Sequence, residues 1–362
     1  MSKFGLIRLT ELYLERIWGG QKLRTLYGKN IPQDKPIGEA WLVSDHPGQE
    51  SAVAEGLYAG RTLHDLVVED PAALLGLRPK LTPHGRFPLL LKLLDAREVL
   101  SVQVHPDDAT ARRLNEPDVG KTEMWYVLQH DSNAELICGL RPSVTKEQFQ
   151  EVANSRQVED QMIRFRVEDG ASVFVPAGTV HAIGSGNVLA EIQQNSDITY
   201  RLYDWGRVGP DGQPRTLHVE KALESIHFGS HHGGANAPLD IEEQGAVRSV
   251  LAACRYFAAE RIKVQQRYRR ATNGATFHIL LAESGRLTVT TEDGSTSLMS
   301  GEALLLPGEL SEFVVEGSGA FLDYYVPELH EDIVSPLCKT GYPMEQILRL
   351  GGDPASSDLN DR

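Results

Sequence analysis

The sequence has few cysteines, no long uncharged apolar run and no excess of basic residues. Its 362 residues include three cysteines, which lie far apart and form no C-x-x-C pair: Cys138, Cys254 and Cys338. Such spacing excludes a disulfide framework and indicates buried or incidental thiols in a reducing compartment. The N-terminus lacks a signal-type apolar core, and no 18 uncharged apolar residues follow one another. We therefore expect a cytoplasmic protein without membrane spans.

The net charge of −14 argues against a general nucleic-acid surface and against binding to anionic membranes. It does allow an anionic small-molecule substrate, which needs only a local basic pocket. The hydrophobic content of 41% is ordinary for a soluble globular protein. A chain of 362 residues exceeds a comfortable single core, so we expect two domains, or one domain with insertions. For the assembly we expect a monomer or a homodimer.

Four side chains in two distant stretches could form a metal site. In the candidate strand Leu100–Val104, Gln103 and the following His105 point to one face, because successive side chains of a strand alternate. Glu123 begins another candidate strand, and a proline turn near residue 176 leads to His181. Each residue alone is ordinary, but an amide, a carboxylate and two imidazoles together suit a borderline divalent metal such as zinc. Three or four protein ligands with an open position would make the site catalytic.

Two basic residues stand in apolar strands. Lys92 lies within a nearly unbroken apolar run, residues 87–94, which suits a strand buried on both faces. Its charge needs a partner or a cavity, or else the side chain reaches the edge of the sheet. Arg201 shares a strand face with Thr199 and Tyr203, where it could grip a phosphate or polarise a carbonyl oxygen. The alternative is that Arg201 braces the sheet through an ion pair with Asp204 or Glu191.

An internal repeat suggests two β-barrels. Residues 170–181 align without gaps with residues 301–312, and both read as turn glycine, apolar strand, proline turn and one polar position. The polar position is His181 in the first copy and Glu312 in the second, so we expect the second barrel to be structural and free of metal.

The domain boundaries follow from composition and from this repeat. We expect a catalytic domain with a helical insertion over 1–230, a linker over 231–240, a second, metal-free β-barrel domain over 241–330, and a C-terminal segment over 331–362 that frays from Gly351. Vicinal histidines in the linker, His231 and His232, fit a solvated loop better than a metal site. Helical spacing predicts helices over 63–77, broken at Asp70-Pro71, over 106–115, and over 142–151 with Ser143 as its cap.

Four runs of the sequence resemble those of type I mannose-6-phosphate isomerases, most closely the shorter bacterial class. They are Leu100-Ser-Val-Gln-Val-His-Pro106, Gly120-Lys-Thr-Glu-Met-Trp-Tyr126, Val175-Pro-Ala-Gly-Thr-Val-His181 and Asn195-Ser-Asp-Ile-Thr-Tyr-Arg-Leu-Tyr-Asp204. The resemblance implies a mainly β fold, a double cupin of two β-barrel or jelly-roll domains with a small helical subdomain. It also implies one zinc ion per chain and interconversion of mannose 6-phosphate with fructose 6-phosphate. Longer members have histidine where this chain has Gly120, so a catalytic role assigned to that histidine cannot be transferred.

By this resemblance the metal would be held by Gln103, His105, Glu123 and His181, and Arg201 would act in the active site. The isomerisation moves a proton between C2 and C1 through a cis-enediol. Lys121 and Glu191 are candidates for the base, and Asp197 is a weaker one that we assign with the substrate-binding residues. Ser101 and Lys92 are candidates for the phosphate end. The alternatives are a non-catalytic sugar-phosphate sensor on the same barrel and a metal cupin oxygenase, whose usual His-x-His is here Gln-x-His.

Overall fold

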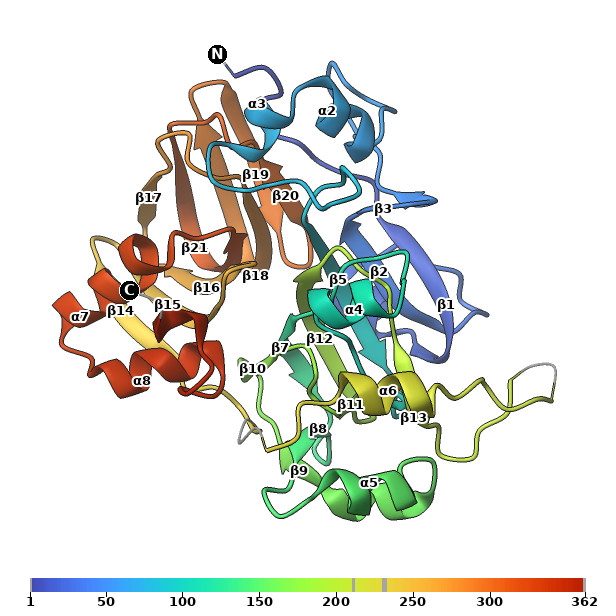
Figure 1. Cartoon of the computed structure of the whole chain (residues 1–362). Helices are drawn as coiled ribbons and strands as arrows, with labels where there is room; N and C mark the ends of the chain where they lie inside the picture. Colours follow the sequence, from blue (N-terminus) through green and yellow to red (C-terminus); the bar gives the residue numbers. More distant parts are fainter. Residues whose placement is uncertain (1, 210–211, 230–232, 361–362) are drawn as a thin grey trace. The chain divides into compact units, whose positions relative to one another are not determined.

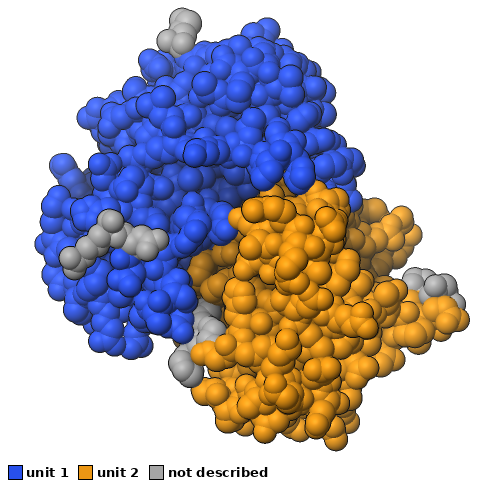
Figure 2. Space-filling view, in the orientation of Figure 1, with its two compact units in different colours: residues 1–12, 41–91, 236–362 blue, residues 13–40, 92–235 orange. Residues whose placement is uncertain are grey.

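The computed structural model of the chain describes residues 2–209, 212–229 and 233–360 (Figure 1). Packing groups them into two units: residues 1–12, 41–91 and 236–362 form one, and residues 13–40 and 92–235 form the other (Figure 2). This division differs from the sequence-based one, which placed residues 1–12 and 41–91 in the catalytic domain. Among the described helices, none is long and apolar enough to cross a membrane.

Two sheets contain most of the strands of the unit of residues 13–40 and 92–235. The six-stranded sheet runs in the order β1 (Leu12–Gly20), β2 (Ile37–Val43), β5 (Leu89–Ala96), β12 (Asn187–Gln194), β7 (Glu123–His130) and β10 (Ser172–Val175). The ends of β1, β2 and β5 at residues 12, 41–43 and 89–91 are grouped with the other unit. The five-stranded sheet runs in the order β13 (Tyr200–Tyr203), β6 (Val102–Val104), β11 (His181–Ile183), β8 (Glu135–Leu140) and β9 (Met162–Arg166). An apolar core joins side chains of both sheets, among them Trp125 and Val127 with Leu136 and Cys138. The mainly β, jelly-roll prediction is confirmed, although the sheets remain separate rather than closing into a barrel.

Helices pack against the other side of the five-stranded sheet and form the predicted helical subdomain. They are α4 (Asp108–Arg113), α5 (Lys146–Val152), η1 (Arg156–Gln161) and α6 (Val219–Ser225). Val102 and Val104 pack in the same cluster as Phe149 of α5 and Ala222 of α6. The cap of α5 is Thr145, whose side chain accepts from Gln148 N. Ser143 was therefore the wrong cap, because the capping box of Thr145 and Gln148 starts the helix at Lys146, four residues later than predicted. The short helix α1 (Lys22–Tyr27) follows β1.

An eight-stranded sheet forms the core of the other unit. Its order is β14 (Leu239–Glu243), β15 (Ala246–Ala253), β16 (Ala258–Val264), β21 (Glu312–Tyr325), β18 (His278–Thr291) and β19 (Gly294–Met299), with β17 (Arg267–Ala271) on β21 and β20 (Ala303–Leu306) on β18. Because β14 begins at Leu239, the predicted linker is shorter than 231–240; His231 and His232 lie outside the described residues. The repeat has the same layout in both copies: β10 leads to His181 at the start of β11, and β20 leads to Glu312 at the start of β21. Glu312 is partly exposed and forms an ion pair with Arg269.

Backbone pairing explains why two N-terminal segments belong to this unit. Ile7 N donates to Leu305 O (3.0 Å), and Phe277 N donates to Leu75 O (2.9 Å). The segment 41–91 holds the hairpin β3 (Asp45–His46) and β4 (Gln49–Glu50) and the helices α2 (Leu63–Glu69) and α3 (Pro71–Leu75). The predicted break at Asp70-Pro71 is confirmed, with the Asp70 side chain capping α3 through Ala73 N.

The C-terminal segment folds as helices rather than as a frayed tail. It contains η2 (Leu329–Val334), α7 (Ser335–Thr340), α8 (Met344–Leu348), η3 (Arg349–Gly351) and η4 (Asp358–Asn360). Leu350 and Leu359 are buried in one cluster with Val250 and Tyr325 of the sheet. For the described residues 351–360 the prediction of fraying was wrong, because Leu359, the one leucine of this polar stretch, is a buried apolar anchor that composition alone hides.

A buried ionic cluster lies in the same unit. The Glu260 carboxylate is fully buried and accepts from Arg248 (2.8 Å), Arg270 (2.6 Å) and the Tyr325 hydroxyl (2.8 Å). Arg270 also contacts Asp323 (2.9 Å). Burial acts to raise the pKa of Glu260, but Arg270 and Arg248 outweigh it and lower that pKa to about 2. The cluster is thus charged and internally compensated at neutral pH.

We expect Glu260→Gln to lower the free energy of unfolding by about 3–5 kcal/mol, because two buried guanidinium groups lose their shared counter-ion. Glu316→Gln is the matched control: it breaks an exposed pair with Arg267, worth less than about 1 kcal/mol. Urea titrations at pH 7 measure both. A carboxylate with a depressed folded-state pKa stabilises the fold above its unfolded pKa, and this stability is lost as pH falls toward about 2. In Glu260→Gln, the free energy of unfolding should no longer show this decrease at acid pH. An unchanged urea midpoint at pH 7 would contradict a stabilising role for the buried Glu260 carboxylate.

Candidate active site

Strand register brings the four predicted metal ligands together. Gln103 lies on β6 and pairs with His181 at the start of β11. Glu123 begins β7, with Val175 of β10 as its partner. Gly178, at a φ of +84°, donates its N–H to His105 O (2.8 Å), so the turn before His181 is fastened beside the end of β6. This left-handed φ favours glycine at the turn.

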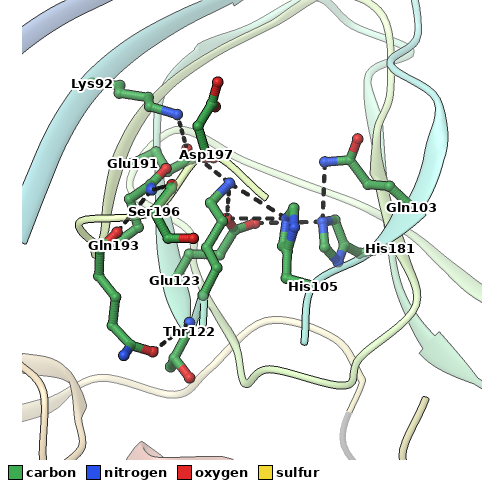
Figure 3. A network of polar contacts seen from close by, with 12 residues as sticks. Lys92, Gln103, His105, Thr122, Glu123, His181, Glu191, Gln193, Ser196 and Asp197 are labelled. Carbon is green, nitrogen blue, oxygen red and sulfur yellow. Dashed lines mark hydrogen bonds and ion pairs between the residues drawn. The ribbon is translucent and has the colours of Figure 1, made fainter. Parts of the chain in front are cut away.

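His105, Glu123 and His181 form a buried cluster whose candidate ligand atoms all lie within 4.8 Å of one another. His105 Nε2 lies 3.5 Å from Glu123 Oε2, and His181 Nε2 lies 3.5 Å from Glu123 Oε1 (Figure 3). His105 Nδ1 faces the Ile198 carbonyl (2.6 Å) and His181 Nδ1 faces the Thr179 carbonyl (2.8 Å). A carbonyl only accepts, so both Nδ1 atoms carry hydrogen, and the unprotonated Nε2 atoms are the ones that can bind a metal. In this structure Lys121 Nζ lies 3.4 Å from His105 Nε2. Burial lowers the pKa of both imidazoles, which favours the neutral, ligating form.

Gln103 reaches the cluster less directly. Its Nε2 lies 3.3 Å from His181 Nε2, and its Oε1 accepts from Ser101 Oγ (3.2 Å). The oxygen and nitrogen of an amide exchange places by a half-turn of χ3, so Gln103 can offer either atom.

Lys121 and Glu191 lie next to the cluster. Lys121 Nζ is 2.8 Å from Glu123 Oε2 and 3.8 Å from Glu191 Oε1. Burial acts to lower the pKa of Lys121, but Glu123 and Glu191 raise it above the usual range, so the side chain is an ammonium. Burial, together with the charge of Glu123, raises the pKa of Glu191. A carboxylate of this kind is a stronger base than an exposed one.

The ion pair of Lys92 with Glu191 settles the first alternative left by the sequence. Lys92 is 3% exposed, and its Nζ lies 3.5 Å from Glu191 Oε1 (Figure 3). The lysine in the apolar strand therefore meets a partner in a cavity and does not reach the sheet edge.

A cavity of about 350 Å³ opens beside these groups. Its lining includes all six residues predicted for catalysis and substrate binding, as well as Gln103. The predicted set is Arg201, Lys121, Glu191, Ser101, Lys92 and Asp197. Sequence reasoning missed Arg16, Glu39 and Arg215, which complete five cationic and three anionic side chains in the lining. Alternation along β1 could have placed Arg16 beside Trp18 on one face, but Arg215 lies in a loop that offered no signal.

Arg201 lines the cavity, and its side-chain hydrogen bonds go to other groups than Asp204 and Glu191, the ion-pair partners of the alternative interpretation. Its Nε donates to Ser101 Oγ (3.3 Å) and its NH1 to Thr216 O (2.9 Å). Asp204 instead pairs with Arg215 (2.6 Å) and Arg207. Burial and, after it, the neighbouring Arg215 lower the pKa of Arg201, while Asp204 acts in the opposite direction.

Fold and site together define a cupin with a mixed imidazole and carboxylate metal-type site beside a cationic cavity. Two family models match the chain: the type I phosphomannose isomerase catalytic domain over residues 6–150, and the mannose-6-phosphate isomerase cupin domain over residues 248–326. The probable mannose-6-phosphate isomerase GmuF of Bacillus subtilis is 39% identical over 87% of this chain and 97% of its own length. The mannose-6-phosphate isomerase of Streptococcus mutans is 34% identical over 84% and 92%. The crystal structure of the Bacillus subtilis mannose 6-phosphate isomerase superposes with a TM-score of 0.81 at 34% identity, covering 88% of this chain and 99% of that one.

The chain belongs to the type I mannose-6-phosphate isomerase family, and it is an isomerase. The predicted double-cupin fold is confirmed with it.

Proposed function

We propose that this enzyme interconverts mannose 6-phosphate and fructose 6-phosphate with one zinc ion, held by His105, Glu123 and His181 and, more weakly, by Gln103. The observation that carries the proposal is the placement of a His-Glu-His cluster beside a cavity with five cationic side chains in a protein of net charge −14. The donor set supports zinc, since two unprotonated Nε2 atoms and a carboxylate are ligands that zinc accepts. When bound, zinc would supply Lewis-acid stabilisation of negative charge on the sugar oxygens.

We assign the proton transfer between C2 and C1 to Glu191. Its raised pKa brings its basicity closer to neutral pH, whereas Lys121 is already protonated and lacks a lone pair. Lys121, as an ammonium 3.8 Å from Glu191, can donate to a sugar oxygen that gains charge. Arg201 would stabilise the same charge from the wall formed with Ser101. Lys92 and Ser101 remain the candidates for the phosphate end, and Asp197, which lines the cavity, for a sugar hydroxyl.

The test of the proposal is a coupled assay with mannose 6-phosphate, run beside elemental analysis of the same preparation. We expect isomerase activity and about one zinc per chain, and we expect a chelator to remove both. Activity that persists in protein stripped of all metal would refute the zinc part alone, and absence of activity in the zinc-loaded protein would refute the reaction.

Replacing Arg201 by lysine separates three roles for this residue. We expect a loss of about 10²–10³ in kcat with little change in KM, because lysine keeps the charge but not the planar fork that also binds Ser101 Oγ and Thr216 O. Arg207→Lys is the matched control, since Arg207 is a nearby arginine that pairs with Asp204 and is not among the residues lining the cavity. A loss confined to KM would mean that Arg201 binds the phosphate, and a lowered melting temperature with normal kcat would mean that it only braces the sheet.

A further inference from the structure

Trp125 is the one neutral donor placed between Glu123 and Glu191 in the described part of the site. Its indole Nε1 lies 3.0 Å from Glu123 Oε1 and 3.1 Å from Glu191 Oε2. The register of β7 and β12 explains this placement: Glu191 pairs directly with Trp125, and Glu123 stands two residues before it on the same face. The side chain is fully buried.

This single N–H faces one oxygen of each carboxylate and leaves the other oxygen to the site. With Oε1 facing Trp125, Glu123 presents Oε2 to Lys121 (2.8 Å) and His105 (3.5 Å). With Oε2 facing Trp125, Glu191 presents Oε1 to Lys92 (3.5 Å) and Lys121 (3.8 Å). Without the donor, each buried carboxylate would lose one hydrogen bond, and only its ion pairs would limit its rotation.

The same ring also contacts a candidate metal ligand. The indole packs edge-on to the His181 imidazole, with ring centroids 5.3 Å apart and an interplanar angle of 72°. Trp125 therefore touches a carboxylate and an imidazole of the metal cluster and the carboxylate that we assign to proton transfer. Packing alone would explain a buried tryptophan in this apolar core, but it would not explain an N–H shared by two carboxylates.

We propose that Trp125 is a positioning residue whose indole N–H sets the orientation of Glu123 for the metal and, at the same time, of Glu191 for the substrate. The inference rests on the proposed function. It differs from a purely structural role because it requires two separate effects of one hydrogen: one on metal affinity and one on turnover at saturating metal.

The experiment compares Trp125→Phe with Trp41→Phe in the full chain. Trp41 is equally buried but lies in the other packing unit, outside the site, so it controls for loss of aromatic volume. Zinc affinity is measured by competition with a chromophoric chelator, and kinetics are measured at saturating zinc. We expect Trp125→Phe to weaken zinc binding about 10–100-fold, the usual effect of losing a residue that orients a metal ligand, and to lower kcat at saturating zinc by at least about 10-fold with KM nearly unchanged.

A second variant removes the hydrogen without removing the volume. Benzothienylalanine at position 125 keeps the bicyclic shape and replaces N–H by sulfur, so it should reproduce both effects even if the phenylalanine variant folds poorly. Normal zinc affinity and normal kcat in the benzothienylalanine protein would overturn the proposal, and so would a change in only one of the two. If the parent enzyme binds zinc but lacks isomerase activity, the reaction proposed above fails, while the affinity measurement still decides the role of Trp125 at Glu123.

Discussion

His181→Ala is expected to lose both bound zinc and isomerase activity while the protein stays folded. The change removes one of the two Nε2 ligands from a cluster of three strong ligands, and three is the usual minimum for a catalytic zinc site. The imidazole also accepts an edge-on contact from Trp125 and donates to Thr179 O, so the variant should lose some stability as well. Its neighbours on β11, Ala182 and Ile183, remain to hold the strand.

Elemental analysis, a coupled assay and a thermal melt on one preparation make the measurement. His130→Ala is the control, because His130 ends β7 in the same packing unit and pairs with Asp169 at the surface. The control should keep zinc and activity. A fully active His181→Ala protein without metal would refute the site.

Glu191→Gln should lower kcat by about 10²–10⁴, the usual contribution of a positioned general base. Glutamine keeps the shape and can still accept from Trp125, but it cannot take a proton. The decisive measurement is exchange of the substrate C2 hydrogen with solvent deuterium, which should fall in parallel with kcat. Glu39→Gln is the matched control, since Glu39 lines the same cavity but forms an ion pair with Arg16 (2.9 Å).

The pH dependence gives a second check on Glu191. A base must be deprotonated to act, so activity falls as pH drops through its pKa. Because burial and Glu123 raise the pKa of Glu191, the acid limb of kcat should lie above that of an ordinary carboxyl group. The limb should disappear from the residual activity of Glu191→Gln. If Glu191→Gln exchanged the substrate C2 hydrogen with solvent at the parental rate, the base would be Lys121 or Asp197 instead.

Local sequence patterns predicted the strands that carry the site. Alternation placed Gln103 and His105 opposite Val102 and Val104, and the structure has the two valines in the cluster that includes the helices. The proline turn before His181 and its repeat before Glu312 were also visible, because turn and strand propensities are properties of a few adjacent residues. The same patterns predicted that His105, Glu123 and His181 would meet, and they lie together in one buried cluster.

The partners of the charged residues were decided only by the tertiary structure. The sequence did not decide whether Lys92 faces a cavity or reaches the edge of the sheet. It also did not decide whether Arg201 acts in catalysis or forms an ion pair with Asp204. In the structure Glu191 forms an ion pair with Lys92, and Arg215, in the loop after β13, forms an ion pair with Asp204. Such contacts depend on strand order, and neighbours in a sheet such as β5 and β12 are far apart in the chain.

The sequence by itself determined the mainly β fold, the ligand types of the metal-type cluster and the family, because each depends on residue identity in short, ordered motifs. Only the tertiary structure decided that residues 1–12 and 41–91 pack with the C-terminal strands, that residues 351–360 are anchored by Leu359, and that Trp125 stands between Glu123 and Glu191. The physical reason is that long-range backbone pairing and burial depend on which distant segments meet, and no local pattern of side chains records that choice.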